Sequence, residues 1–225
     1  MIRSLSAAVP RFALFLLALV PVLIGGLILA SMYFGLSNDF NAPEDILRRD
    51  SYPIAVIGHI LGGITMLMLG FTQFSPGLRR NFPQVHRWVG RGLVGAGGYF
   101  ALSGLWMNAA KGAQVDSALY DVAQNFVAVA FLAVLFLGVR AILQRRVAAH
   151  RAWMMRAYAI TLGAATQTVM LLPVFLLFGP PQGLVADLAF ISGWVVNLTV
   201  AEWVIRRGQV AGVRNGRTMT APNRS

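Results

Sequence analysis

The chain contains no cysteine, a single lysine and few acidic residues, and each shortage excludes a class of protein or site. The absence of cysteine excludes disulfide bonds, thiolate metal sites and cysteine nucleophiles. Charged residues make up 12 % of the 225 residues, whereas ordinary soluble domains carry about 25 %. Since 57 % of the residues are hydrophobic, the composition indicates one integral membrane domain.

Six long apolar segments follow one another along the chain, separated by short polar connections. They cover residues 12–36, 53–73, 88–110, 122–142, 153–178 and 184–205. A hydrocarbon core of about 30 Å is crossed by roughly 20 helical residues, and each segment reaches that length. The sequence therefore predicts an all-α, polytopic membrane protein with six transmembrane helices, of which the second to fifth form a four-helix core. Residues 1–207 form the membrane domain, and residues 208–225 are expected to be a disordered cytoplasmic tail.

The cationic residues gather on one side of the expected membrane. All but three of the nineteen lie near the N-terminus, in the second and fourth connections or in the C-terminal tail; the exceptions are Arg48, Arg49 and Lys111. Because arginine and lysine are in excess in cytoplasmic loops, both termini are expected on the cytoplasmic side of a bacterial inner membrane. The net charge of +11 then reflects helix ends that meet anionic lipid headgroups, and no nucleic-acid partner is expected.

Two of the three histidines are expected at the same membrane level, at the cytoplasmic ends of the third and fifth helices. Two imidazoles that face each other across a bundle suit bis-histidine haem ligation or a divalent metal ion. Nearby arginines suit haem propionates, because a planar guanidinium pairs with a carboxylate bidentately. One hypothesis is therefore haem b, with His86 and His150 as iron ligands and Arg87, Arg91, Arg151 and Arg156 around the propionates. Glycines of the third helix would admit a flat group, but small residues also pack membrane helices without a cofactor.

The third histidine, His59, lies inside the second helix and in its outer half. An ionisable residue within a membrane helix is expected to face the bundle interior. The inner end of this helix is about 20 Å away at 1.5 Å per residue, so His59 cannot share a metal ion with His86 and His150. Gln167 lies at a comparable depth in the fifth helix, where Pro173 is expected to bend the chain. His59 is then either a neutral, hydrogen-bonded structural residue or a group that binds a ligand or relays protons.

The middle of the chain contains a weak internal repeat. Arg79-Arg80 precedes His86-Arg87, and Arg145-Arg146 precedes His150-Arg151. Counting back 21 residues from the second arginine of each pair makes Asn125 the counterpart of His59, so a second bis-histidine site is not available. Two short basic matches also arise by chance, because cytoplasmic turns are rich in arginine.

Three segments carry a resemblance to a known family: Gly70-Phe71-Thr72-Gln73-Phe74, His86-Arg87-Trp88-Val89-Gly90-Arg91 and His150-Arg151-Ala152-Trp153-Met154-Met155-Arg156. They resemble domain-of-unknown-function family 2306, a group of bacterial multi-pass membrane proteins, over about residues 55–175. A looser similarity is to six-helix cytochromes of the b561 kind, which hold haems among four central helices. The first resemblance implies a membrane fold without an activity, and the second implies haem binding, although the fourth helix of this chain has no histidine.

Three functions remain open on the sequence alone. The first is a haem-binding redox or electron-transfer protein with a quinone or another redox partner. The second is a cofactor-free protein that binds or moves a small molecule or lipid, with His59 and Gln167 lining a cavity. The third is a structural subunit of a membrane complex, including a homo-oligomer.

No hydrolytic motif is present in the sequence. The glycine pattern that begins at Gly90 lies at the start of a membrane helix instead of following a strand, so it does not indicate nucleotide binding.

Overall fold

The computed structural model describes residues 2–34, 53–110, 118–179 and 183–219, and these residues are helical apart from short turns. The helices in chain order are α1 (Ile2–Phe34), α3 (Pro53–Gly70), the 3-10 helix η2 (Phe71–Phe74), α4 (Pro76–Asn81), α5 (Pro83–Ala110), α6 (Ala118–Leu143), α7 (Val147–Thr161), α8 (Gly163–Phe178) and α9 (Gly183–Met219). The all-α fold predicted from the sequence is confirmed.

Five described segments are long and apolar enough to cross a membrane: Phe15–Phe34, Pro53–Phe74, Leu119–Leu143, Val147–Phe178 and Gly183–Gly208. The remaining expected segment, the third along the chain, corresponds to α5. This helix contains Arg87, Arg91 and several glycines and is therefore less apolar. With 28 residues, α5 is about 42 Å long and packs against the spanning helices α3 and α6. The protein is thus a polytopic membrane protein.

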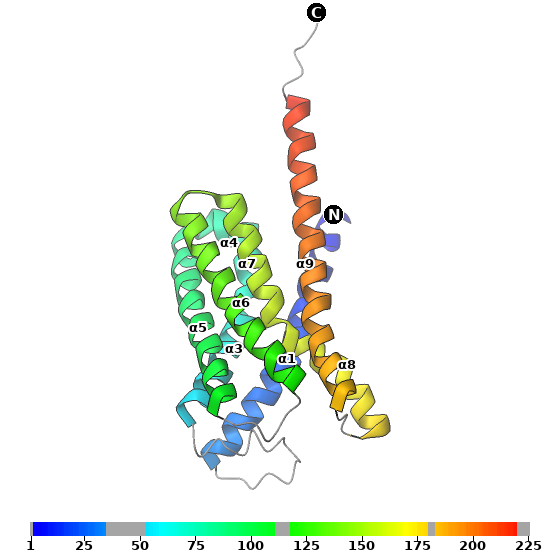
Figure 1. Cartoon of the computed structure of the whole chain (residues 1–225). Coiled ribbons are helices and arrows are strands. Elements are labelled where there is room, and N and C mark those ends of the chain that lie inside the picture. The colour runs from blue at the N-terminus through cyan, green and yellow to red at the C-terminus, as the bar shows by residue number, and fades with distance from the viewer. Residues whose placement is uncertain (1, 35–52, 111–117, 180–182, 220–225) are drawn as a thin grey trace, which may run out of the picture.

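Four helices form the central bundle, and the other long helices cover one side of it (Figure 1). The most extensive packing is between α3 and α5 and between α6 and α7, while α5 also contacts α6 and α3 contacts α7. The helices α5 and α7 therefore lie diagonally across the bundle. The helix α1 packs on α3 and α8, and α9 packs on α8, α7 and α6.

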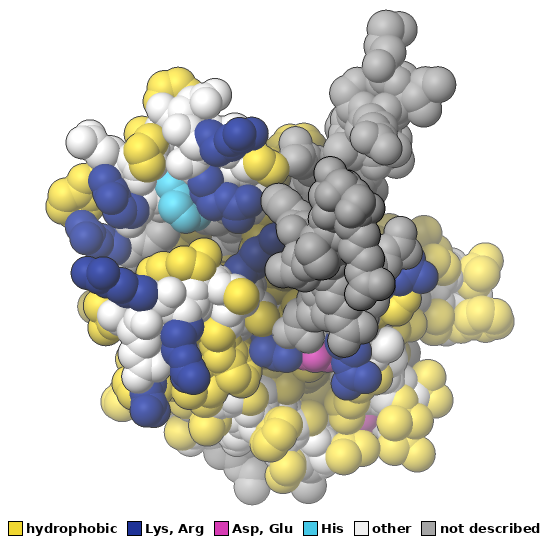
Figure 2. Space-filling model, turned by 90° about the horizontal axis from the view of Figure 1, so that it is seen from above, with side chains coloured by type: hydrophobic (Ala, Val, Ile, Leu, Met, Phe, Trp, Pro, Cys, Tyr) yellow, Lys and Arg dark blue, Asp and Glu magenta, His cyan; other side chains and the backbone are white. Residues whose placement is uncertain are grey.

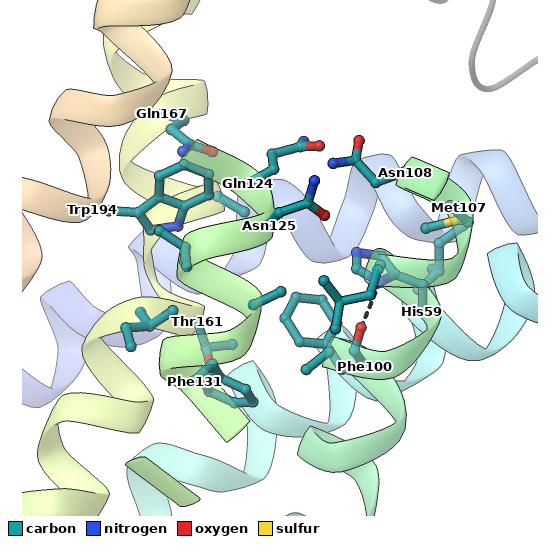
Figure 3. A pocket seen from close by; sticks show the side chains of 18 of the residues that line it. His59, Phe100, Met107, Asn108, Gln124, Asn125, Phe131, Thr161, Gln167 and Trp194 are labelled. Carbon is teal, nitrogen blue, oxygen red and sulfur yellow. Dashed lines mark hydrogen bonds between the residues drawn. The ribbon is translucent and has the colours of Figure 1, made fainter. Parts of the chain in front are cut away.

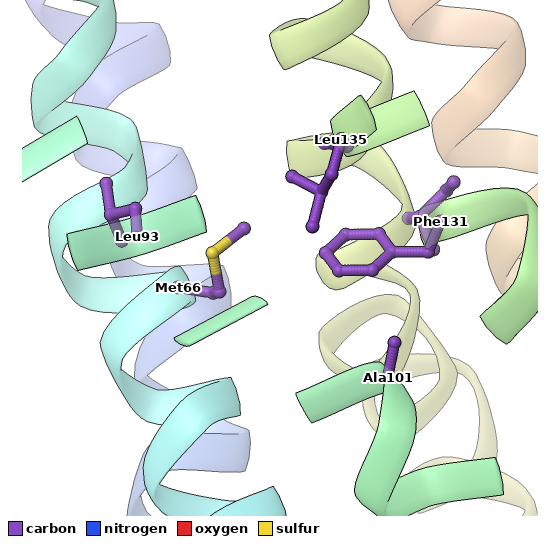
Figure 4. Close-up of a cluster of buried hydrophobic side chains, with 7 residues drawn as sticks. Met66, Leu93, Ala101, Phe131 and Leu135 are labelled. Carbon is purple, nitrogen blue, oxygen red and sulfur yellow. The ribbon is translucent and has the colours of Figure 1, made fainter. Parts of the chain in front are cut away.

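A compact apolar cluster fills the middle of the four-helix bundle (Figure 4). Phe131 of α6 is 1 % exposed and packs with six other buried side chains: Met66, Leu93, Ala101, Leu135, Ala157 and Ile160. Gly97 lets α5 approach this cluster closely, since a Cβ atom there would lie 3.2 Å from the sulfur of Met66. The cluster separates the end of the bundle that carries His86 and His150 from the end that carries His59.

The fifth expected helix is divided in two, at a different position from the one predicted. Pro173 lies inside α8, and the interruption falls at Leu162, between α7 and α8. The backbone of Leu162 has ψ −12°, closer to a 3-10 turn than to an α-helix. Gly163 follows immediately and carries the indole of Trp194 against its Cα atom. The bend therefore arises from packing against α9 and not from the proline.

The last helix extends further than the sequence predicts. The helix α9 continues to Met219, whereas a disordered tail was expected from residue 208. No proline interrupts residues 183–219, and each residue added to an existing helix gains one hydrogen bond. Residues 220–225 lie outside the described residues, as do the expected outer connections at 35–52 and 111–117.

Candidate functional site

A cavity of about 480 Å³ lies beyond the apolar cluster, at the end of the bundle that carries His59 (Figure 3). Its walls are mostly apolar and come from all four helices of the bundle, with α1, α8 and α9 closing one side. A small number of polar or hydrogen-bonding side chains face it: His59, Asn108, Tyr120, Gln124, Asn125, Thr161, Gln167 and Trp194. The cavity thus brings together His59 and Gln167, which the sequence singled out, and Asn125, the counterpart of His59 in the weak repeat.

His59 is held flat against α5. Its Nδ1 atom donates to the backbone carbonyl of Phe100 over 2.9 Å, and its ring stacks on the Phe100 ring with centroids 4.2 Å apart. A Cβ atom at Gly104 would lie 3.2 Å from the imidazole Cε1, so glycine leaves room for this ring position. A backbone carbonyl can only accept a hydrogen bond, so Nδ1 carries the proton. In the neutral ring the remaining nitrogen, Nε2, is therefore an acceptor.

Gln167 and Trp194 belong to the closely packed hairpin of α8 and α9. The Nε2 atom of Gln167 donates to the carbonyl of Phe190 over 2.6 Å, and the side chain is 7 % exposed. A Cβ atom at Gly163 would lie 2.2 Å from Cδ1 of Trp194, so the indole edge occupies the space that a side chain would take. These contacts fix both residues on the cavity wall (Figure 3).

The sequence reasoning missed Trp194, Gln124 and Thr161 as cavity residues. Tryptophan is enriched at membrane interfaces, so a tryptophan near the middle of the last membrane segment is unusual. This unusual position is the signal in the sequence that points to Trp194. Gln124 and Thr161 carry no such signal, because the side chain of a single polar residue in a membrane helix can form its hydrogen bonds with several kinds of partner, including the backbone of its own helix. Thr161, for example, donates to the carbonyl of Ala157 in its own helix over 3.1 Å.

One residue that lines the cavity, Asn125, is also exposed on the surface of α6. The neighbouring exposed residues on the same face of α6 are apolar: Val122, Phe126 and Val129. A helix face of this kind contacts lipid in a membrane protein, so Asn125 belongs both to the cavity wall and to a surface that faces the bilayer.

The two remaining histidines lie together at the opposite end of the bundle. His86 is close enough to Arg79 and His150 for their positive charges to lower its pKa, in addition to a larger lowering of the pKa by burial. His150 donates from Nδ1 to the carbonyl of Gly138 over 2.8 Å, which ties α7 to α6. The Nδ1 atom of His86 is buried and has no hydrogen-bond partner among the described residues. Figure 2 shows arginine side chains gathered around a histidine on this face.

Apolar core side chains occupy the space beside these two histidines. Val89, Leu93 and Met154, each about one turn or two further into the bundle, already pack in the central apolar cluster. Three glycines expected to admit a flat group, Gly92, Gly95 and Gly98, meet nothing within 4 Å of an added Cβ atom and so face away from the bundle interior. A haem between His86 and His150 would require these core side chains to move.

Two of the four arginines expected around haem propionates have partners within the protein. Arg156 forms a forked ion pair with Glu202 of α9, with Nη2 3.1 Å from Oε2, and its guanidinium lies 4.5 Å from the Trp153 ring. Arg91 lies over Trp88 at 5.0 Å, and Arg87 and Arg151 are exposed. Across the part of the chain that the structure describes, no group of three or more histidine or acidic side chains is placed to hold a metal ion. Haem ligation by His86 and His150 stays a prediction.

The fold and the cavity define a multi-pass, all-α membrane protein with a hollow in the membrane-spanning bundle. Residues 56–205 match the family DUF2306, described as "Predicted membrane protein", and the chain belongs to this family. The matched region runs from α3 into α9 and includes all three histidines, Gln167 and Trp194. No curated protein and no solved structure matches the chain.

Proposed function

We propose that this protein binds an uncharged, largely apolar small molecule that it takes from the lipid bilayer. The observation that carries the proposal is the cavity of about 480 Å³ between the membrane helices. Ligand sites in proteins are typically concave and about 300–1,000 Å³ in volume, with apolar walls and a few placed polar groups. The cavity around His59 has each of these properties.

The lining of the cavity favours an uncharged ligand. Among the described residues that line it, none is an aspartate, glutamate, lysine or arginine. A charged ligand would therefore leave water without a partner of opposite charge, at a cost far above that of an uncharged polar group. His59 is the one imidazole on the described wall of the cavity.

The exposure of Asn125 supports entry from the membrane. Asn125 lines the cavity and lies between apolar residues of α6 that face lipid. A molecule dissolved in the bilayer reaches this point without crossing the headgroup region. The ligand is then an amphiphile or a small lipophilic compound, and the protein is a binding or transport protein for it.

We further propose that the protein lies in a bacterial inner membrane with its termini in the cytoplasm. The C-terminal end of α9, the helix α4 and the turn between α6 and α7 lie at the same end of the molecule (Figure 1). The arginines of Figure 2 belong to this end, and an excess of arginine marks the cytoplasmic side. The cavity then lies in the half of the membrane away from the cytoplasm.

A matched pair of substitutions on α6 tests the proposed function. Ala128 lines the cavity, whereas Ala133 is exposed on the same helix. We expect Ala128→Phe to fill the cavity and Ala133→Phe to leave it open. Wild-type protein and the Ala133→Phe variant, purified from their own membrane, should yield the same extracted small molecule by mass spectrometry, and Ala128→Phe should yield several times less. Equal amounts from all three proteins would contradict the proposal.

A further inference from the structure

We infer that the ligand of the cavity carries a hydroxyl group that donates hydrogen bonds to the protein, so that hydroxylated apolar molecules such as phenols or long-chain alcohols are its chemical class. The inference rests on the proposed function, because it names the kind of molecule that the same cavity binds. It follows from how two side chains on the cavity wall, His59 and Thr161, have already used their single hydrogen-bond donors.

The N–H group of the neutral His59 ring is already hydrogen-bonded within the protein. Its Nδ1–H group is bonded to the carbonyl of Phe100, which also accepts from the hydroxyl of Ser103 over 3.0 Å. Because Nδ1 lies against α5 while the ring lines the cavity, Nε2 is the ring nitrogen that a ligand can reach. A neutral imidazole has only an unshared pair to offer there, so His59 can accept but not donate.

Thr161 is arranged in the same way, and Gln167 in part. The hydroxyl of Thr161 donates to the carbonyl of Ala157, and one of the two amide N–H groups of Gln167 donates to the carbonyl of Phe190. Both partners are backbone carbonyls, so the direction of each bond is fixed. The amide oxygen of Gln167 and the hydroxyl oxygen of Thr161 keep lone pairs for another donor, and both residues line the cavity.

The remaining polar side chains keep both donors and acceptors. The amide nitrogen of Gln124 donates one hydrogen bond to the Tyr120 hydroxyl over 2.6 Å, and that of Asn108 donates one to the carbonyl of Asp121 over 3.4 Å, so each amide retains a second N–H. The Nε1 edge of Trp194 lies against Gly163. The inner wall therefore offers acceptors from three helices, α3, α7 and α8, and a hydroxyl group can donate to one of them while it accepts from an amide N–H.

A ligand with a donor group matches this wall better than one without. A site built to accept a hydrogen bond discriminates against an analogue that lacks the donor, because its polar groups are then left unpaired. An ammonium group would also donate, but none of the described lining residues carries a carboxylate to balance its charge. A hydroxyl group donates without carrying a charge, which leaves hydroxylated apolar molecules as the class that fits.

The test compares two probes that differ only in the donor, 4-octylphenol and its methyl ether 4-octylanisole. Binding to the full-length protein in nanodiscs is measured by equilibrium dialysis, with empty nanodiscs as the blank. We expect the phenol to bind about tenfold more tightly than the ether, since an unpaired polar group in the cavity weakens ether binding. Ala128→Phe should abolish binding of both probes, which assigns the binding to the cavity.

Two variants locate the acceptors. His59→Phe keeps a ring to stack on Phe100 but removes Nε2, and Thr161→Val keeps the side-chain shape but removes the hydroxyl oxygen. In at least one of them, the preference for the phenol should fall several-fold while ether binding stays unchanged. Thr161→Val decides the question if His59→Phe fails to fold.

The possible failures are distinguishable. If both probes bind with equal affinity and Ala128→Phe removes both, the hydroxyl assignment is wrong and the cavity still binds ligands. If a preference for the phenol survives undiminished in both acceptor variants, the assignment is also wrong. If Ala128→Phe leaves the binding of both probes intact, the proposed function itself fails.

Discussion

At the scale of single residues, the sequence placed two polar side chains near one another and did not predict the contacts of the arginines. His59 and Gln167 were placed on one cavity in the second of the three functional hypotheses, and both line the cavity in the structure. The reason is general: a polar residue inside a membrane helix must turn toward protein. The contacts of Arg156 were not predictable, because its partner Glu202 is far away in sequence and either residue could have met other charges.

His86 provides a prediction on pH. Burial and the nearby charges of Arg79 and His150 lower its pKa in the folded protein, so the unfolded chain binds a proton more readily. Stability therefore rises with pH across the range in which only the unfolded state is protonated, and it falls as the pH drops below about 6.5, the ordinary pKa of histidine. We expect the melting temperature to decrease from pH 7.5 to pH 5.5, and to decrease less in His86→Gln.

Arg79→Gln is the matched control for that experiment. Removing this positive charge should raise the pKa of His86 toward its ordinary value, without reaching it, because burial is the larger cause of the lowering. NMR titration of the His86 ring measures this shift directly. A pKa of His86 that is lower in Arg79→Gln than in wild type would show that the described arrangement is wrong.

At the scale of helices, the sequence predicted the apolar segments well and the break in the fifth segment poorly. Segment positions follow from local hydropathy, which is read from neighbouring residues. The break at Leu162 depends instead on Trp194, which comes from the next helix. A contact between distant parts of the chain leaves no trace in the local composition.

The packing of Trp194 on Gly163 is tested by a pair of glycine substitutions. A Cβ atom at Gly163 would lie 2.2 Å from the indole, whereas one at Gly95 would meet nothing within 4 Å. Gly163→Ala should therefore lower stability by about 1–3 kcal/mol, as overpacking does, and should shift the tryptophan fluorescence. Gly95→Ala should be neutral or stabilise α5 by up to about 1 kcal/mol. Equal melting temperatures for the two variants would contradict the packing.

The ion pair between Arg156 and Glu202 ties α7 to α9. The two side chains are partly buried, with 23 % and 36 % of their surface exposed. In a double-mutant cycle with Arg156→Met and Glu202→Gln, we expect a coupling of about 0.5–3 kcal/mol, as for residues in direct contact. Thermal unfolding of the two single variants and the double variant measures it. Strictly additive effects would show that the pair does not form in the membrane.

At the scale of the whole molecule, the distribution of arginine predicts a topology that reporter fusions can test. Reporters placed in the turn at Gln144 and after α9 should read cytoplasmic, because these segments share the basic end of the bundle (Figures 1 and 2). A reporter after Ala113 should read external. A cytoplasmic reading at Ala113 would exclude α5 as a membrane-spanning helix and would place the cavity at another depth.

The most direct test of the account is a high-resolution structure of the protein purified in nanodiscs made from its own membrane. The account predicts density for an elongated molecule in the cavity, with a polar end within hydrogen-bonding distance of His59 Nε2 or of the side-chain oxygens of Gln167 and Thr161. A cavity closed by the surrounding side chains, or filled only by ordered water in every particle class, would contradict the proposal that this protein binds a small molecule from the bilayer.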